Sequence, residues 1–133
     1  MARPDGSNSI GTLLYHLAAI EADWLLEEIL AGADFPPEFV ELLKYDVRDD
    51  AGHLVSVIVE PLATHLERLE RVRAYFLERI AGMTAEDFHR PRLLERYDVS
   101  PAWVIHHLIQ HEAEHRGQIG EIRQMAEKAL GKS

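Results

Sequence analysis

The fold is decided by residues 100–131, which read SPAWVIHHLIQHEAEHRGQIGEIRQMAEKALG. Ser100 and Pro101 place an N-cap residue and a first-turn proline together, which is typical of a helix start. Gly131 is a natural helix stop. The apolar residues between them recur at helical spacing and form one stripe: Val104, Leu108, Ile119, Ile122 and Ala126. The segment therefore predicts one long helix, running to about residue 130, with one buried face.

Several histidines of this helix fall close to the apolar stripe. Because a helix advances about 100° per residue, His111 and His115 lie within the stripe, one turn apart. His107 lies at its edge, and His106 points away toward solvent. A buried imidazole without a partner is unfavourable, so both inward rings must bind something. Two imidazoles four residues apart can reach one metal ion, and hydrogen-bonded core histidines are the alternative.

The N-terminal third of the chain predicts one long and one short helix. Apolar residues at helical spacing indicate a helix over residues 10–29, with N-cap candidates at residues 7–9 and a stop at Gly32. A short helix is predicted over residues 36–44. The polar residues 46–52 are predicted to form a loop.

A further long amphipathic segment covers residues 58–80 and ends at Gly82. Pro61 lies inside it, so the helix either kinks there or begins there. Residues 67–71, ERLER, are predicted to form a solvated face with local ion pairs. Residues 84–87 resemble a capping box for one short turn. The pattern as a whole predicts an all-α fold.

Composition limits the class of protein. The 133 residues predict one domain, residues 1–133, and only residues 55–59 are ambiguous between strand and helix. The 14 basic and 23 acidic residues give a net charge of −9, which disfavours nucleic acid and anionic membranes as partners. No apolar run approaches the roughly 18 residues of a membrane span. The absence of cysteine excludes disulfides and thiolate ligands and is compatible with the cytoplasm, where we expect the protein.

A third histidine is needed for a metal site with a position open to water or substrate. His16 is flanked by Leu13 and Ile20 at the margin of the apolar face of the first helix, where it can reach an interhelical space. His65 also lies on the apolar face of its helix. We therefore expect a site built between helices, as in other helical bundles.

The string HEAEH, residues 111–115, also fits the His-Glu-x-x-His pattern of zinc peptidases, with Glu112 as the general base. Such enzymes add a further ligand downstream and an active-site sheet. No histidine follows His115 and no sheet is predicted, so this reading is disfavoured.

Three segments carry a resemblance to a known family. They are SIGTLLYHLA (residues 9–18) followed by Glu21 and Trp24, MTAEDF (residues 83–88), and HLIQHEAEHRGQI (residues 107–119). On these segments the chain resembles, over nearly its whole length, the DinB/YfiT-like superfamily of metal-binding helical bundles. The resemblance implies an up-down four-helix bundle that carries a divalent metal ion, zinc or nickel. It implies His16, His111 and His115 as the metal ligands.

The resemblance also suggests an activity, because related proteins include transferases and isomerases that use low-molecular-weight thiols such as bacillithiol or mycothiol. We expect a metal-dependent thiol transferase or hydrolase acting on a small molecule. Glu21, Glu112 and His107 are the candidate acid–base or supporting groups. The alternative is a non-catalytic bundle stabilised by metal, or a stress-associated oligomerisation module, and a fourth ligand from His65 or His107 would favour it.

One departure from the family concerns the first helix. In relatives a helix usually precedes the one that carries the first metal histidine, whereas here only eight residues precede Ser9. We expect the N-terminal helix to be missing or shortened, or replaced by the short helix of residues 36–44. An open three-helix bundle exposes an apolar face, which predicts either a homodimer or a truncated chain.

Overall fold

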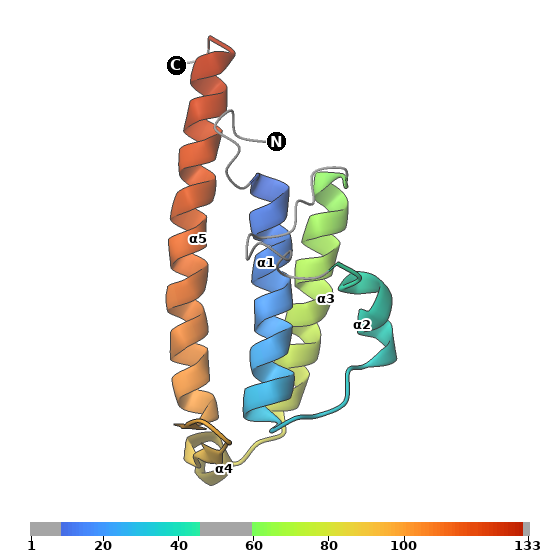
Figure 1. Ribbon diagram of the computed structural model, residues 1–133, viewed down its shortest axis with the longest axis vertical. Coiled ribbons are helices and arrows are strands. Elements are labelled where there is room, and N and C mark those ends of the chain that lie inside the picture. Colours follow the sequence, from blue (N-terminus) through green and yellow to red (C-terminus); the bar gives the residue numbers. More distant parts are fainter. Residues whose placement is uncertain (1–8, 46–59, 132–133) are drawn as a thin grey trace.

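The computed structural model describes residues 9–45 and 60–131 (Figure 1). In chain order its elements are α1 (Ile10–Asp23), the π-helix η1 (Trp24–Ile29), α2 (Pro37–Leu42), α3 (Leu62–Ala81), α4 (Ala85–His89), β1 (Arg92–Leu93), β2 (Asp98–Val99) and α5 (Pro101–Ala129). Helices dominate, which confirms the predicted all-α class. The predicted loop of residues 46–52 and the ambiguous residues 55–59 lie outside the described residues. None of the described helices combines the length and apolarity needed to cross a membrane.

Helix α1 lies between α3 and α5 and packs against both (Figure 1). Tyr15 lies beside Arg68 and Glu21 beside Arg73, so α1 and α3 run in the same direction. Helix α5 runs antiparallel to them (Figure 1). The short helix α2 covers the groove between α1 and α3 on the outer side, with Phe39 buried in it. The described residues therefore form three long α-helices, α1, α3 and α5, with two short ones, α2 and α4, beside them.

Helix starts follow the predicted caps. The side chains of Ser9, Thr84 and Ser100 accept hydrogen bonds from the backbone N–H groups three residues further on. Helix α3 begins directly after Pro61, its N-cap residue, so the kinked alternative is wrong. The first helix has the predicted extent, but its last six residues wind as the π-helix η1.

The π-helix has a consequence for the core. Its residues Leu25, Leu26 and Ile29 are all buried, and each is at most 3% exposed. Leu26 packs into the cluster that includes Phe39, whereas Leu25 and Ile29 pack into a second cluster around Val104. The end of α1 therefore contacts the α2–α3 side and the α5 side at once, which holds α1 in place against both neighbouring long helices.

Two short strands were not predicted. Arg92 pairs with Val99 and Leu93 with Asp98 in an antiparallel ladder that precedes α5. Each strand has two residues, which is too short for an alternating pattern to be recognised. The buried Arg92 donates to the carbonyl oxygens of Ile29, Asp87 and Arg90, and so ties this turn to the end of η1.

The predicted solvated face of residues 67–71 is wrong for Arg68, whose exposed fraction is 2%. Its guanidinium donates to the carbonyl oxygen of Leu42 at 2.6 Å, to Nδ1 of His65 at 3.0 Å and to Oε1 of Glu60 at 2.7 Å. It also lies over the ring of Tyr15. Arg68 therefore links α3 to the end of α2. Arg71, in contrast, is exposed and pairs with Glu67, as predicted for this face.

Candidate metal centre

Three histidines from two helices converge between α1 and α5. His16 comes from α1 and is 6% exposed, while His111 and His115 come from α5 and are partly buried. Nε2 of His111 lies 3.0 Å from Nε2 of His16 and 3.1 Å from Nε2 of His115. One ring nitrogen from each residue lies within 4.8 Å of the other two. His16 was predicted to lie at the margin of the apolar face of its helix. It is buried, because α5 packs against that side of α1.

The three ring nitrogens are close enough to share one metal ion, and hydrogen bonds alone satisfy them poorly. Ligand nitrogens in tetrahedral zinc sites, with Zn–N bonds of about 2.0–2.1 Å, are separated by roughly 3.3 Å. Each neutral imidazole carries one proton, so Nε2 of His111 cannot form good hydrogen bonds to both neighbouring nitrogens at once. A cation that accepts a lone pair from each ring removes this conflict. The three histidines can therefore hold a divalent metal ion.

Gln118 controls the orientation of one ring. Its Oε1 lies 2.6 Å from Nδ1 of His115, one turn along α5. A carbonyl oxygen only accepts, so this contact keeps the proton of His115 on Nδ1 and leaves the Nε2 lone pair facing the other two histidines. Partners of this kind raise the affinity of a histidine for metal. Gln118 was not predicted as a site residue, although it lies within the segment that carries the family resemblance.

We expect Gln118→Ala to weaken metal binding by roughly 10–100-fold, because the His115 ring loses the contact that sets its tautomer. Competition of the protein with a chelating dye for zinc measures the change. Gln110→Ala is the matched control, since Gln110 is an exposed amide on the same helix. Equal affinities of the two variants would show that Gln118 has no such role.

Burial, followed by the positive charges of His115 and His107, lowers the pKa of His111. A lowered pKa keeps the ring neutral at a pH where an ordinary histidine begins to protonate. The neutral imidazole is the form that binds metal. The environment of His111 therefore reduces the competition between protons and a metal ion.

The two candidate carboxylates meet on one arginine beside the histidines. Arg73 binds Glu21 through Nε and Nη2, the shorter contact being 2.7 Å, and its Nη2 also lies 3.2 Å from Oε2 of Glu112. The hydrogen bond with Glu21 raises the pKa of Arg73. Glu21, Arg73 and Glu112 line a small cavity together with His111. Arg73 is thus a site residue that was not predicted from the sequence. Helical periodicity indicates on which face of its helix a residue lies, but it does not identify the residues that bind it.

The other two histidine candidates lie elsewhere. The ring of His107 stacks on Trp103, with ring centroids 5.1 Å apart, and also contacts Trp24 at 4.8 Å. His65 is buried beside Arg68, and burial followed by the charge of Arg68 lowers its pKa. Within the described residues, neither ring joins the group of three ligating nitrogens. The fourth ligand considered for a closed structural site is therefore not supplied by these two histidines.

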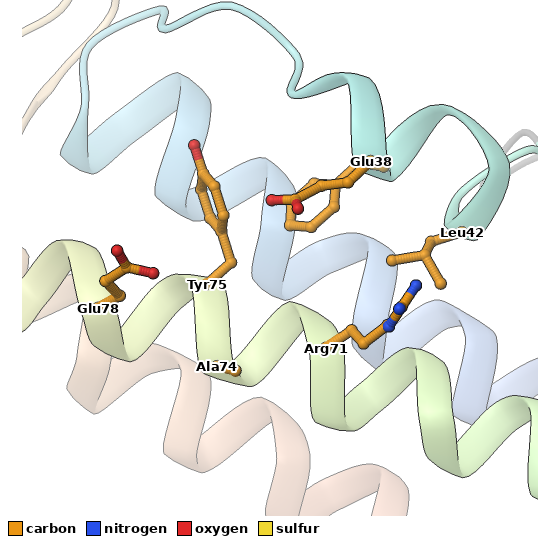
Figure 2. Close-up of a pocket in the computed structure, with 7 residues that line it drawn as sticks. Glu38, Leu42, Arg71, Ala74, Tyr75 and Glu78 are labelled. Atoms are coloured by element: carbon orange, nitrogen blue, oxygen red, sulfur yellow. The ribbon is translucent and has the colours of Figure 1, made fainter.

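Two larger hollows flank the bundle. One, of about 230 Å³, lies between α3 and α5 and shares Glu21, Arg73, Leu108 and Glu112 with the small cavity beside His111. The other, of about 310 Å³, lies between α2 and α3 and is bordered by Glu38, Tyr75 and Glu78, among others (Figure 2). None of the three converging histidines lines either hollow, but the smaller hollow shares four lining residues with the cavity beside His111, whereas the larger one shares none.

Comparison with known proteins identifies the family. The family model described as the DinB superfamily matches residues 2–119, a range that includes all three converging histidines. Comparison with curated proteins gave no match, and neither did comparison with solved structures. The helical bundle and the histidine group agree with the match. The chain therefore belongs to the DinB superfamily.

Proposed function

We propose that this protein is a metal-dependent enzyme acting on a small molecule, either a thiol transferase or a hydrolase, with zinc or nickel held by His16, His111 and His115. The observation that carries the proposal is the convergence of three ring nitrogens next to a cavity. Three histidine ligands leave a position for water or a thiol, whose pKa the bound metal ion lowers.

The hollow of about 230 Å³ supports a substrate with an apolar part. Its apolar lining comes from α3 and α5, namely Phe76, Leu77, Ile105, Leu108 and Ile109. Its polar end is formed by Glu21, Arg73 and Glu112, which also border the cavity beside His111. A substrate whose apolar part occupies this hollow has its reacting end directed toward the three histidines.

Glu112 is the best placed of the candidate acid–base groups. Its side chain is 54% exposed and makes one contact with Arg73 at 3.2 Å, whereas Glu21 is 13% exposed and holds Arg73 through three contacts. Glu112 can therefore leave Arg73 at little cost, while Glu21 keeps the guanidinium in place. In this proposal Glu112 accepts the proton of the thiol or water, and Glu21 and Arg73 position the substrate.

We expect Glu112→Gln to lower kcat by roughly 10²–10⁴-fold without loss of metal, because the amide is isosteric but cannot accept a proton. Glu114→Gln is the control, since Glu114 is exposed on the same helix without a contact to Arg73. Steady-state rates and metal content of both variants measure the effect. An equal loss in the two variants would contradict the role of Glu112.

The activity itself is tested with protein loaded with zinc or nickel and with metal-free protein. One assay follows conjugation of a low-molecular-weight thiol, bacillithiol or mycothiol, to an electrophile, and the other follows hydrolysis of an activated ester without thiol. Turnover that requires both metal and thiol identifies a transferase, and turnover that requires metal alone identifies a hydrolase. Absence of both activities at full metal occupancy would favour the non-catalytic, metal-stabilised bundle.

A further inference from the structure

His65 of α3 is the most buried of the described histidines, and it lies outside the three-histidine group. Its Nδ1 lies 3.0 Å from Nη1 of Arg68. A guanidinium can only donate, so Nδ1 accepts and the single proton of the neutral ring is on Nε2. Within the described part of the chain, Nε2 is buried and has no hydrogen-bond partner. The site therefore holds His65 as one tautomer of the neutral ring.

The guanidinium beside His65 is fixed by contacts at each of its nitrogens. Nε of Arg68 donates to the carbonyl oxygen of Leu42 at 2.6 Å, and Nη2 donates to Oε1 of Glu60 at 2.7 Å. The face of the group lies over the ring of Tyr15, with Cζ 4.8 Å from the ring centroid. Arg68 therefore cannot turn away from His65 without giving up another partner.

Protonation of His65 is incompatible with this arrangement. An imidazolium donates from both nitrogens, so the new Nδ1–H faces the N–H of Arg68, and two positive groups meet at 3.0 Å. Among the described residues, Arg68 and Glu60 are the charged groups that act on the ring. The phenol of Tyr15 from α1 and the carbonyl of Leu42 from α2 carry no charge at acidic pH. Burial, followed by the charge of Arg68, outweighs Glu60 and lowers the pKa of His65.

The contact that an added charge on His65 breaks most easily is the one to α2. Of the two other partners of Arg68, Leu42 offers a neutral carbonyl, whereas Glu60 offers a carboxylate and forms the stronger bond. Helix α2 has six residues, too few for a helix that is stable alone, so its position depends on such contacts. Leu42 and Tyr75 also border the hollow of about 310 Å³ between α2 and α3 (Figure 2).

We propose that His65 and Arg68 form a pH-sensitive switch, in which protonation of His65 displaces Arg68 and releases the C-terminal end of α2 from α3. At neutral pH the ring is neutral and α2 is held in place. As the pH falls, the end of α2 moves away and the hollow of about 310 Å³ widens. The switch does not rest on the proposed enzymatic activity, because none of its groups lies in the metal centre.

The release of α2 is measured by amide hydrogen exchange followed by NMR. The amide of Leu43 donates to the carbonyl oxygen of Phe39 and reports on the end of α2, and the amide of Val104 reports on α5. After correction for the intrinsic pH dependence of exchange, protection of Leu43 should fall roughly tenfold between about pH 7.5 and about pH 5.5. This is the limit for one group that protonates near pH 6.5 only in the open state. Protection of Val104 should change far less.

The decisive variant is His65→Asn. The side-chain oxygen of Asn stands near the place of Nδ1 and can accept from Arg68, but it does not protonate in this pH range. Protection of Leu43 should then be the same at both pH values. His106→Asn is the matched control, since His106 is exposed on α5, and it should keep the full response to pH. An equal loss of protection in His65→Asn and in the unsubstituted protein would overturn the proposal.

A second measurement needs no substitution at this position. NMR of the histidine rings of the unsubstituted protein follows His65 and His106 during the same titration. The ring of His65 should stay neutral at pH values where that of His106 is already protonated, and its protonation should accompany the loss of protection at Leu43. If His65 protonates together with His106 while Leu43 keeps its protection, the contact with Arg68 does not act as a switch.

Discussion

We expect His111→Ala to remove stoichiometric metal from the protein. Nε2 of His111 lies next to the ring nitrogens of both His16 and His115, so its loss leaves two nitrogens that no longer share a central partner. Losing a ligand should exceed the roughly 10–100-fold loss seen for residues that only support a ligand. Elemental analysis after dialysis against zinc or nickel, with one ion per chain as the reference, measures the change.

The control for this experiment is His106→Ala, since His106 is an exposed histidine of the same helix and lies outside the three-histidine group. The combined His16, His111 and His115 to Ala variant sets the baseline for metal bound elsewhere. If His111→Ala retains as much metal as His106→Ala, the three histidines are hydrogen-bonded core residues. The proposed enzyme would then have no metal bound by these histidines, and the main reason to expect catalytic turnover would be removed.

The convergence of the three histidines was largely predictable from sequence. Spacing of four residues within an apolar stripe predicts that His111 and His115 face the core together, because helical geometry determines which side chains share a face. His16 required the family resemblance, since its own helix indicates only a marginal position. Arg73 and Gln118 were missed because helical periodicity gives the face of a residue but not its partner. The contact between Arg73 and Glu21 joins residues 52 positions apart.

The fold prediction was limited in the same way, because local sequence patterns do not identify partners that lie far away in the chain. Caps at Ser9, Thr84 and Ser100 act within three residues and were predicted correctly. The buried position of Arg68 depends on the carbonyl oxygen of Leu42, 26 residues earlier, and a run such as ERLER is indistinguishable from a solvated face until that partner is placed.

Among substitutions in residues 67–71, which were predicted to be solvated, Arg68→Ala should be the most destabilising. We expect it to lower the free energy of unfolding by roughly 3–5 kcal/mol. The guanidinium has three partners, and its side chain and that of Glu60 are only 3% and 12% exposed. Its removal leaves a carboxylate and a carbonyl oxygen with little access to water. Urea or guanidinium unfolding followed by circular dichroism measures the loss. Arg71→Ala, three residues along the same helix, removes only an exposed pair with Glu67 and should cost less than about 1 kcal/mol.

A double-mutant cycle with Glu60 separates the causes of that loss. If much of the cost of Arg68→Ala comes from the uncompensated carboxylate, then Glu60→Gln should recover part of the stability in the Arg68→Ala background while destabilising the unsubstituted protein. Additive effects would instead mean that the cost lies in the bond to Leu42 and in the lost packing over Tyr15. Arg68→Lys distinguishes these further, because an ammonium keeps the charge near Glu60 but cannot reproduce the planar set of donors. Equal stabilities of Arg68→Ala and Arg71→Ala would contradict a structural role for Arg68.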